Sequence, residues 1–221
     1  MDFFEVVRQR RMVREYDTGR ALPEGLLDRL VDVGLRAPTA GFTQGVSFLI
    51  LDEPADRERF WAASSGPGEP DRWLRGMRTA PALILVLTSA DAYLDRYALP
   101  DKGWAAGPKD PRPAEASAMN WTAPYWFVDA GMAAMAILYA VVDAGSELGG
   151  CFFGVPADRV DRVRSEFAVP FEQEVVGVVS VGYRAVAERR SGSPRRRARR
   201  PRTELVHRGQ WSAVDESPRK S

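Results

Sequence analysis

Three arginines lie close together at the end of the first predicted helix: Arg10, Arg11 and Arg14. Arg10 and Arg14 are four residues apart and Arg11 is three from Arg14, so a helical or turned backbone would bring the guanidinium groups together. Because like charges repel, the cluster is explained most simply by an anion bound among the side chains. A basic helix end in solvent, favoured by the helix dipole, is the alternative that this segment leaves open.

A second basic run lies near the C-terminus. Residues 193–202 contain six arginines and no acid, whereas the whole chain of 221 residues has a formal net charge of only +1. The rest of the chain is therefore acidic overall, which argues against a general nucleic-acid-binding surface. The run itself reads either as a solvated basic arm or as an arm that contacts phosphates without sequence preference.

Several other kinds of site are disfavoured by composition. Cys151 and His207 are the only cysteine and the only histidine. They cannot build a disulfide framework or a cysteine metal site, and they argue against a histidine-rich metal centre and most catalytic triads. The chain has no GxGxxG and no GxxxxGK[ST] motif, so neither common phosphate-binding loop is indicated. We expect no metal site.

Two further segments and a group of aromatic residues carry groups that suit a ligand. The loop 37–45 offers hydroxyl and amide side chains, and Gly41 would let its backbone approach a ligand closely. Gly149 and Gly150 precede a predicted strand and could expose their N–H groups. The aromatic residues that could stack on a flat ligand are Phe42, Trp104, Trp121, Tyr125 and Trp126. Each feature has a simpler alternative. The loop could be an ordinary connection, the two glycines a plain turn, and the aromatic residues part of the core.

The elements that must position these residues follow from hydrophobic periodicity. The continuous apolar run at 82–88 predicts a fully buried strand. Predicted strands cover residues 46–51, 82–88, 149–155 and 174–183. Predicted helices start after Asp2, open at Pro23, and cover 54–63, 71–77, 125 to about 145, and 156–167. This order predicts a single α+β or α/β domain in which helices sandwich a sheet.

The helix predicted from Tyr125 is apolar enough to need a membrane check. Residues 125–142 approach the length of a membrane span, but they include Asp129 and many alanines and glycines, and no Lys or Arg flanks them closely. We expect a buried core helix or a helix between subunits. The N-terminus lacks a signal-peptide pattern, so we expect a cytoplasmic protein without membrane contact. Residues 97–124 are polar and proline-rich, and a connection of that length is typical of a lid or a disordered segment.

Taken in order along the chain, these segments resemble the flavin-dependent nitroreductase family. Residues 10–16 resemble its N-terminal R-R-S-x-R-x-F, and residues 37–45 are similar to its A-P-S-x-x-N-x-Q-P. Residues 128–134 resemble its central D-x-G-x-A helix, and residues 148–151 stand where the family has G-L-G-S. Arg200, Arg202 and residues 206–211 look like its basic C-terminal element. Each motif is weak alone, but the ordered set covers most of the chain.

The resemblance implies an α+β fold of three layers, with a mainly antiparallel central sheet flanked by helices. It also implies an intertwined homodimer with two FMN sites at the subunit interface. Residues 1–184 would form the FMN-binding domain, within which residues 97–124 form a lid or insertion loop. Residues 185–221 would be an arginine-rich extension that completes the FMN phosphate site.

Residue by residue, the resemblance assigns most of these groups to FMN. The implied FMN-binding residues are Arg10, Arg11, Met12, Arg14, Pro38, Thr39, Ala40, Phe42, Gln44, Gly149, Gly150, Arg200 and Arg202. The arginines would bind the phosphate and ribityl chain, and the two glycines would present N–H groups near flavin N5 and O4. Met12, Phe42 and Gly45 depart from the family's serine, asparagine and proline, so Met12 offers only its backbone.

The resemblance implies an oxidoreductase in which flavin N5 carries the hydride and no side chain acts as catalyst. NAD(P)H would be the reductant and a nitroaromatic, quinone-like or other conjugated small molecule the acceptor, stacked on Trp104, Trp121 or Tyr125. A flavin-dependent dehydrogenase or oxidase of a biosynthetic pathway is the first alternative, and an enzyme that binds a deazaflavin instead of FMN is a further variant. A non-catalytic protein that binds nucleic acid through its basic tail is the alternative of another class, and we expect it less.

Overall fold

The computed structural model describes residues 1–102, 121–188 and 197–211. The chain divides into two compact units, Met1–Glu188 and Arg189–Ser221, which are described separately. The predicted lid residues 103–120, including Trp104, lie outside the described residues.

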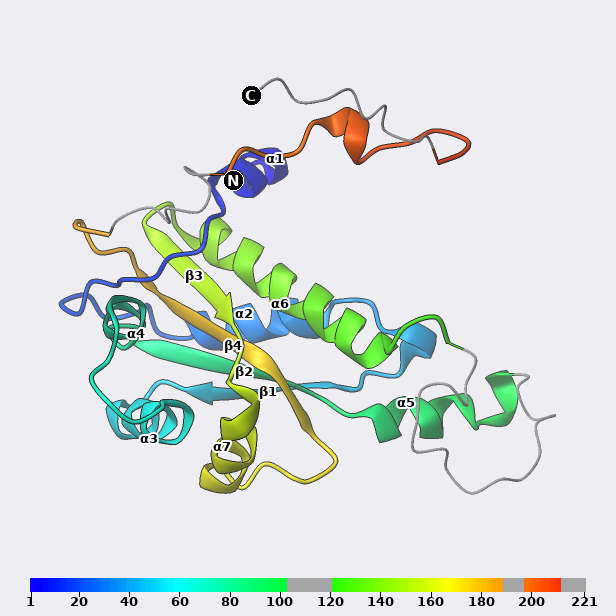
Figure 1. The fold of residues 1–221 in the computed structure, drawn as a ribbon, viewed down its shortest axis with the longest axis horizontal. Coiled ribbons are helices and arrows are strands. Elements are labelled where there is room, and N and C mark those ends of the chain that lie inside the picture. Colours follow the sequence, from blue (N-terminus) through cyan, green and yellow to red (C-terminus); the bar gives the residue numbers. More distant parts are fainter. Residues whose placement is uncertain (103–120, 189–196, 212–221) are drawn as a thin grey trace. The chain divides into compact units, whose positions relative to one another are not determined.

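The first unit is built on a four-stranded sheet with the order β1-β2-β4-β3 (Figure 1). Its strands are β1 (Val46–Leu51), β2 (Ala82–Thr88), β3 (Leu148–Phe153) and β4 (Glu174–Tyr183). All three pairings are antiparallel, and β2 is buried along its whole length. The predicted antiparallel sheet is therefore confirmed, including the fully buried strand at 82–88.

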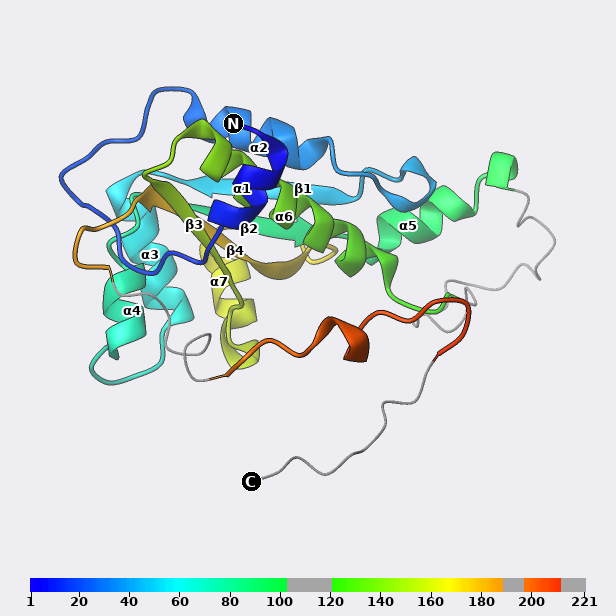
Figure 2. The same cartoon turned by 90° about the horizontal axis from the view of Figure 1, so that it is seen from above.

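Helices cover both faces of the sheet and make the three predicted layers (Figure 2). Alternate side chains of β2 enter two separate cores, with Leu83 and Leu85 on one face and Ile84 and Val86 on the other. The first core also contains side chains of α3 (Pro54–Ser64), α4 (Arg72–Met77) and α7 (Val160–Glu166). The second contains side chains of α2 (Leu26–Leu35) and α6 (Tyr125–Ala144).

Two helix predictions need correction, and one helix was not predicted. The helix predicted to open at Pro23 begins at Leu26, after Gly25 in a left-handed conformation with φ 68°. The helix predicted from Pro156 starts as a 3-10 turn, η4 (Ala157–Arg159), before α7. The sequence interpretation missed α5 (Ala90–Tyr97), which is only eight residues long and is followed by the 3-10 turn η2 (Pro100–Lys102).

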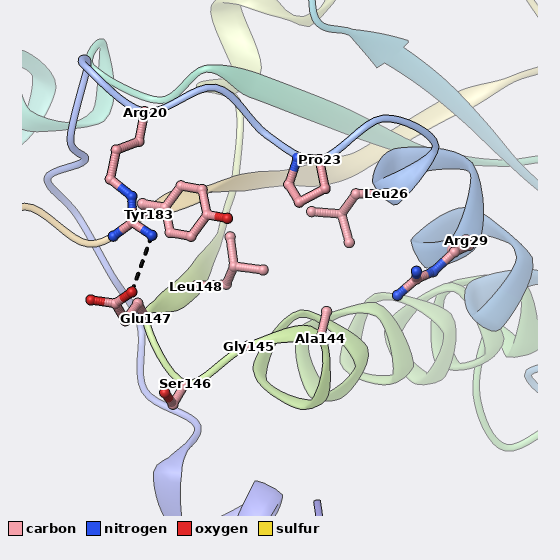
Figure 3. Close-up of a pocket in the computed structure, with 10 residues that line it drawn as sticks. All are labelled: Arg20, Pro23, Leu26, Arg29, Ala144, Gly145, Ser146, Glu147, Leu148 and Tyr183. Carbon is pink, nitrogen blue, oxygen red and sulfur yellow. Dashed lines mark hydrogen bonds and ion pairs between the residues drawn. The ribbon is translucent and has the colours of Figure 1, made fainter.

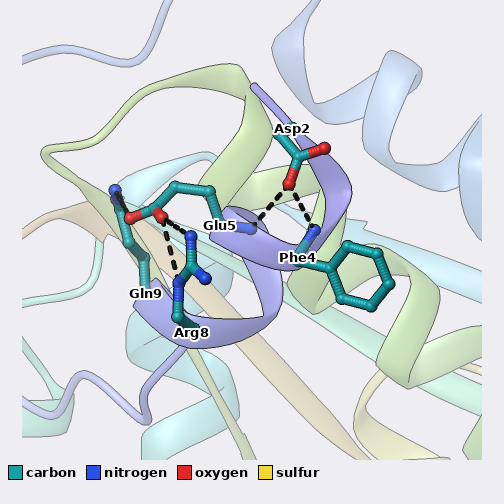
Figure 4. Close-up of polar contacts among 5 residues, drawn as sticks. All are labelled: Asp2, Phe4, Glu5, Arg8 and Gln9. Atoms are coloured by element: carbon teal, nitrogen blue, oxygen red, sulfur yellow. Dashed lines mark hydrogen bonds and ion pairs between the residues drawn. The ribbon is translucent and has the colours of Figure 1, made fainter.

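The first helix, α1 (Phe3–Gln9), ends before the arginines. Asp2 caps it by accepting the N–H groups of Phe4 at 3.0 Å and Glu5 at 3.4 Å, and Glu5 in turn binds Arg8 and Gln9 (Figure 4). The predicted cap at Asp2 is thus confirmed. The helix stops at Gln9, so the arginine cluster is not part of it.

By length and composition alone, α6 could cross a membrane. One such helix is weak support for a span, because the central helix of a globular protein passes the same test. Here α6 packs one side against the sheet and α2, with Ala130, Ile137 and Val141 fully buried. Its other side is considered below.

The described part of the second unit is small. It contains the 3-10 turn η5 (Arg202–Glu204), an ion pair from Arg200 Nε to Glu204 at 3.0 Å, and a stacked pair of rings. The stacked rings are those of His207 and Trp211, whose centroids lie 4.0 Å apart.

Candidate functional site

The arginine segment runs as irregular, non-helical chain along the edge of the sheet. Arg10 is the cap residue of α1, and its N–H donates to the Val6 carbonyl. Beyond it, Met12 forms a parallel bridge with Gly150, and the Val13 N–H donates to the Gly150 carbonyl at 3.0 Å. The expected helical or turned cluster is therefore wrong: pairing with β3 holds this segment, and no helical spacing brings the arginines together.

Arg11 has an internal anion as its partner. Its Nη1 forms an ion pair with Glu188 Oε2, and the Arg14 N–H donates to Glu188 Oε1 at 3.4 Å. The Glu188 side chain is only 2% exposed, so this is a buried carboxylate. Arg11 Nε is also buried and has no hydrogen-bond partner within the described residues. Sequence reasoning missed Glu188, since nothing local relates it to a segment 174 residues away.

Arg10 and Arg14 remain available for an external anion. Neither makes an ion pair within the described ranges, and the Arg14 guanidinium donates only to the Met12 carbonyl, at 3.4 Å. Arginine side chains that lack an acidic partner suit the oxygen atoms of a phosphate group, which accept several charge-assisted hydrogen bonds. Within the part of the chain that the structure describes, Arg11 thus has an acidic partner, whereas Arg10 and Arg14 have none.

Helix α4 lies directly against the arginine segment. A Cβ atom at Gly76 would lie 2.2 Å from the Arg14 carbonyl oxygen, so the two backbones touch. The Tyr16 N–H also donates to Thr79 Oγ1 at 2.8 Å, just beyond the end of this helix. The positions of Arg14 and α4 are therefore coupled.

An aromatic cavity of about 230 Å³ is lined in part by α4. It is lined by Phe60, Trp61, Ser64, Ser65, Gly66, Asp71, Trp73, Leu74, Phe153, Gly154, Val155 and Pro156. The rings of Trp61 and Phe153 stack there at 5.7 Å. Trp61 Nε1 and Ser64 Oγ are buried without a hydrogen-bond partner in the described chain, and buried polar groups normally have one.

Sequence reasoning missed this cavity as well. The available signal was the Gly154-Val155-Pro156 turn directly after a strand, together with Trp61 and Trp73 on two flanking helices.

Gly149 and Gly150 lie inside β3, away from that cavity's lining. A Cβ atom at Gly149 would lie 2.3 Å from Val13 Cγ2, and one at Gly150 would lie 2.9 Å from the Ser180 carbonyl oxygen. These glycines let the arginine segment and β4 approach closely. Their contact with a flavin stays a prediction.

The loop predicted to line the flavin contains the 3-10 turn η1 (Ala40–Phe42) and an unusual backbone. Gly41, Phe42 and Gln44 all have positive φ, between 56° and 65°. Pro38, Phe42 and Gln44 are exposed, and Thr39 accepts the Gln44 N–H at 3.0 Å. The loop is thus formed and accessible, as a binding loop must be.

The predicted acceptor residues are partly brought together. The Trp121 ring contacts Tyr97 at 4.9 Å and Tyr125 at 5.5 Å, edge to face in both cases. Tyr93 and Trp126 complete this aromatic cluster. A substrate role for Trp121 and Tyr125 stays a prediction, and Trp104 lies outside the described residues.

No side chain in this region is arranged as a nucleophile. Burial raises the pKa of the Cys151 thiol, so it stays protonated near neutral pH. Among the residues that the structure describes, no group of three or more His, Cys, Asp or Glu could hold a metal ion. The site offers cations, an aromatic cavity and N–H donors.

A second cavity, of about 310 Å³, lies at the far end of α6 (Figure 3). Here Arg20 donates to Glu147 at 3.1 Å and stacks on the Tyr183 ring at 3.6 Å. Because these polar groups already satisfy one another, this cavity is the weaker candidate for a cofactor.

Arg200 and Arg202 belong to the second unit, whose place relative to the arginine segment is not determined. Arg200 is paired with Glu204 there. Their contact with a phosphate stays a prediction.

Comparison with known proteins assigns the chain to a protein family. The model of the nitroreductase family matches residues 7–183, from the arginine segment to the end of β4. The chain belongs to the nitroreductase family. It is 24% identical over 187 residues to a Methanothermobacter thermautotrophicus protein named NADH dehydrogenase/NAD(P)H nitroreductase, covering 84% of this chain and 78% of the relative.

Solved structures share the nitroreductase fold. A nitroreductase of Exiguobacterium sibiricum, named as such and solved with FMN, matches with a TM-score of 0.70 and 18% identity over 96% of this chain and 98% of that one. The NADPH:FMN oxidoreductase of Vibrio harveyi, solved with NAD⁺, matches with a TM-score of 0.69 and 15% identity over 97% of this chain and 80% of that one. At these identities the likeness establishes the fold alone.

Proposed function

We propose that this nitroreductase family member is an FMN-dependent oxidoreductase that uses NAD(P)H to reduce nitroaromatic, quinone-like or other conjugated small molecules. Family membership supports the oxidoreductase class. The observation that carries the proposal further is the pair Arg10 and Arg14, which have no acidic partner among the described residues. Both lie on a segment that packs against α4, a helix that also lines the aromatic cavity.

The residues present fit such a cofactor. Arg10 and Arg14 would hold the phosphate, and the aromatic cavity offers the flat side chains of Trp61 and Phe153 to a ring. When bound, FMN supplies hydride transfer through N5, which explains why the chain needs no nucleophile of its own. Predicted contacts of Pro38, Thr39, Gln44, Gly149, Gly150, Arg200 and Arg202 belong to this proposal.

The chain's own residues have two tasks in this scheme. The arginines would fix the cofactor by its phosphate, to which they can donate charge-assisted hydrogen bonds. The aromatic cavity keeps water from the ring, and the apolar cluster around Trp121 gives a conjugated acceptor a surface to stack on.

The absorbance spectrum of the purified protein tests the proposal. We expect flavin absorbance that NAD(P)H bleaches under anaerobic conditions and that menadione restores. Bound flavin that neither NADH nor NADPH reduces would contradict the reductase and favour the dehydrogenase or oxidase. A deazaflavin would show its own absorbance band, and a colourless protein that shifts DNA in a salt-dependent manner would contradict flavin chemistry altogether.

We also propose that the protein is a homodimer, because one side of α6 is apolar and is left exposed by the residues that the structure describes. A location in the cytoplasm stays an expectation from the sequence. Val128, Met132 and Met135 recur at helical spacing and are exposed, as is Phe127 beside them. Helix α1 extends this surface with exposed Phe3, whose ring contacts Tyr139 of α6 at 5.8 Å. Contiguous exposed apolar residues of this kind mark an interaction surface, and a second copy would cover them.

Met132→Glu is expected to convert the dimer to a monomer, since it places a charge in the centre of that surface. Val33→Glu is the matched control, because Val33 is 38% exposed on α2 where Met132 is 39% exposed on α6. Sedimentation or light scattering should show a monomer for Met132→Glu alone. A dimer in both variants would place the interface elsewhere.

A further inference from the structure

The loop Thr39–Gln44 holds an exposed aromatic side chain in a strained backbone. Phe42 has φ 56° and Gln44 has φ 57°, a region that residues other than glycine rarely adopt. The Phe42 side chain is nevertheless 75% exposed, so its own packing does not enforce this conformation. Strain of this kind persists only where surrounding contacts impose it, and it occurs often at binding sites.

The first contact that imposes it comes from Asp129 on α6. Asp129 is 2% exposed, and its Oδ2 accepts the Ala40 N–H at 2.7 Å and the Tyr93 hydroxyl at 2.7 Å. Burial, together with the hydrogen bond to Asp129, raises the pKa of Tyr93, so the hydroxyl keeps its proton and remains a donor. A buried carboxylate needs such donors, and here one of them is the backbone of the loop.

The second contact comes from Arg96 on α5. Its Nε donates to the Gly41 carbonyl at 2.9 Å, while Nη1 and Nη2 donate to the two Asp101 oxygens at 2.8 and 2.7 Å. This bidentate pair fixes the guanidinium plane, and thereby the direction of Nε. The Tyr97 ring packs on the same peptide, since a Cβ atom at Gly41 would lie 2.8 Å from it.

Asp129 and Arg96 therefore fix the two residues immediately before Phe42. Asp129 accepts the Ala40 N–H, and Arg96 donates to the Gly41 carbonyl. We infer that Asp129 and Arg96 are positioning residues that hold the Phe42 ring as a fixed surface for the flat ring of the electron acceptor. This inference rests on the proposed function. It gives Phe42, which the resemblance implied as an FMN-binding residue, the role of selecting aromatic acceptors. An acceptor ring is the occupant favoured here because the loop adjoins the aromatic cluster through Tyr97, which contacts Trp121.

Kinetics with two acceptors test the inference in the FMN-loaded enzyme. The probes are 4-nitrobenzoate, which has a flat ring, and ferricyanide, which has none. Phe42→Ala and Arg96→Met should each raise KM for 4-nitrobenzoate by about three- to tenfold, the size of one aromatic stacking contact. KM for ferricyanide should change by less than about twofold, because a stacking contact does not serve a ringless acceptor.

The double variant Phe42→Ala/Arg96→Met separates positioning from general damage. If Arg96 acts only through Phe42, the double variant should be no worse than Phe42→Ala alone. Asp101→Asn is the matched control, since it leaves the Arg96 Nε bond to Gly41 in place, and it should change KM less than Arg96→Met. Additive effects, or an equal rise of KM for both acceptors, would overturn the inference.

Hydrogen exchange in the FMN-free protein gives a readout that does not depend on activity. Asp129→Asn should speed exchange across residues 39–44, whereas Tyr93→Phe keeps the Asp129 bond to Ala40 and should have a smaller effect. Unchanged exchange in Asp129→Asn would overturn the anchoring. If Phe42→Ala turned the protein into a monomer, the Phe42 ring would pack against a second copy of the chain, and the acceptor role would be overturned. The absorbance spectrum tests the proposed function separately. A wild-type protein that binds no flavin would contradict that function, whatever the exchange rates of the loop are.

Discussion

Replacing Arg10 and Arg14 together by alanine should raise the Kd for FMN by at least about 100-fold. Neither guanidinium has an acidic partner within the described residues, so both remain free to bind a phosphate. Each charge-assisted hydrogen bond is worth about 1.5–3 kcal/mol, and every 1.4 kcal/mol is a factor of ten in affinity. Fluorescence titration of FMN into flavin-stripped protein measures the change.

Two comparisons make this result specific for the phosphate. Arg8→Ala is the control variant, because Arg8 is an exposed arginine of α1 already paired with Glu5 (Figure 4). It should leave the Kd within about twofold, as expected for an exposed ion pair. Riboflavin lacks the phosphate, so its Kd should respond far less than that of FMN to the double replacement. If the double variant bound FMN with a normal Kd, Arg10 and Arg14 would not be part of the cofactor site.

Much of the fold follows from local sequence. The apolar run at 82–88 predicts β2, and Asp2 predicts the start of α1, because hydrophobic periodicity and capping act over a few residues. Helix α5 was not predicted, because eight residues are too few for their hydrophobic periodicity to distinguish a helix from a loop. The end of α1 was misplaced because the i, i+4 spacing of Arg10 and Arg14 resembles a helix, whereas pairing of Met12 with Gly150 imposes another backbone.

The site was less predictable, since its contacts join distant parts of the chain. In the sequence, Asp129 argues against a membrane span and belongs to the segment that resembles the family's central helix. Neither observation reveals its partners Ala40 and Tyr93, which lie 89 and 36 residues away. No sequence pattern relates Glu188 to Arg11, because the turn after β4 alone brings the two side chains together. Residue types thus indicated an anion site, but which arginines are free to serve it depends on tertiary contacts.

The buried pair of Arg11 and Glu188 should be a large contribution to stability. Glu188→Ala leaves the Arg11 charge without its partner, and breaking a buried pair in this way costs about 3–5 kcal/mol. The Arg11 side chain is 28% exposed, so water can replace part of the lost contact and the lower end of that range is expected. Urea denaturation of the FMN-free protein measures the loss, and the same protocol should show a smaller loss for Glu188→Gln, which keeps an acceptor oxygen.

A double-mutant cycle distinguishes the pair from two independent effects. Arg11→Met/Glu188→Leu removes both charges at once, so it should lose less stability than the two single replacements together. Arg11→Met should also weaken FMN binding far less than Arg10→Ala, because its charge is already compensated by Glu188. If instead Arg11→Met weakened FMN binding as strongly as Arg10→Ala while stability stayed unchanged, Glu188 would be only an incidental neighbour and all three arginines would serve the phosphate.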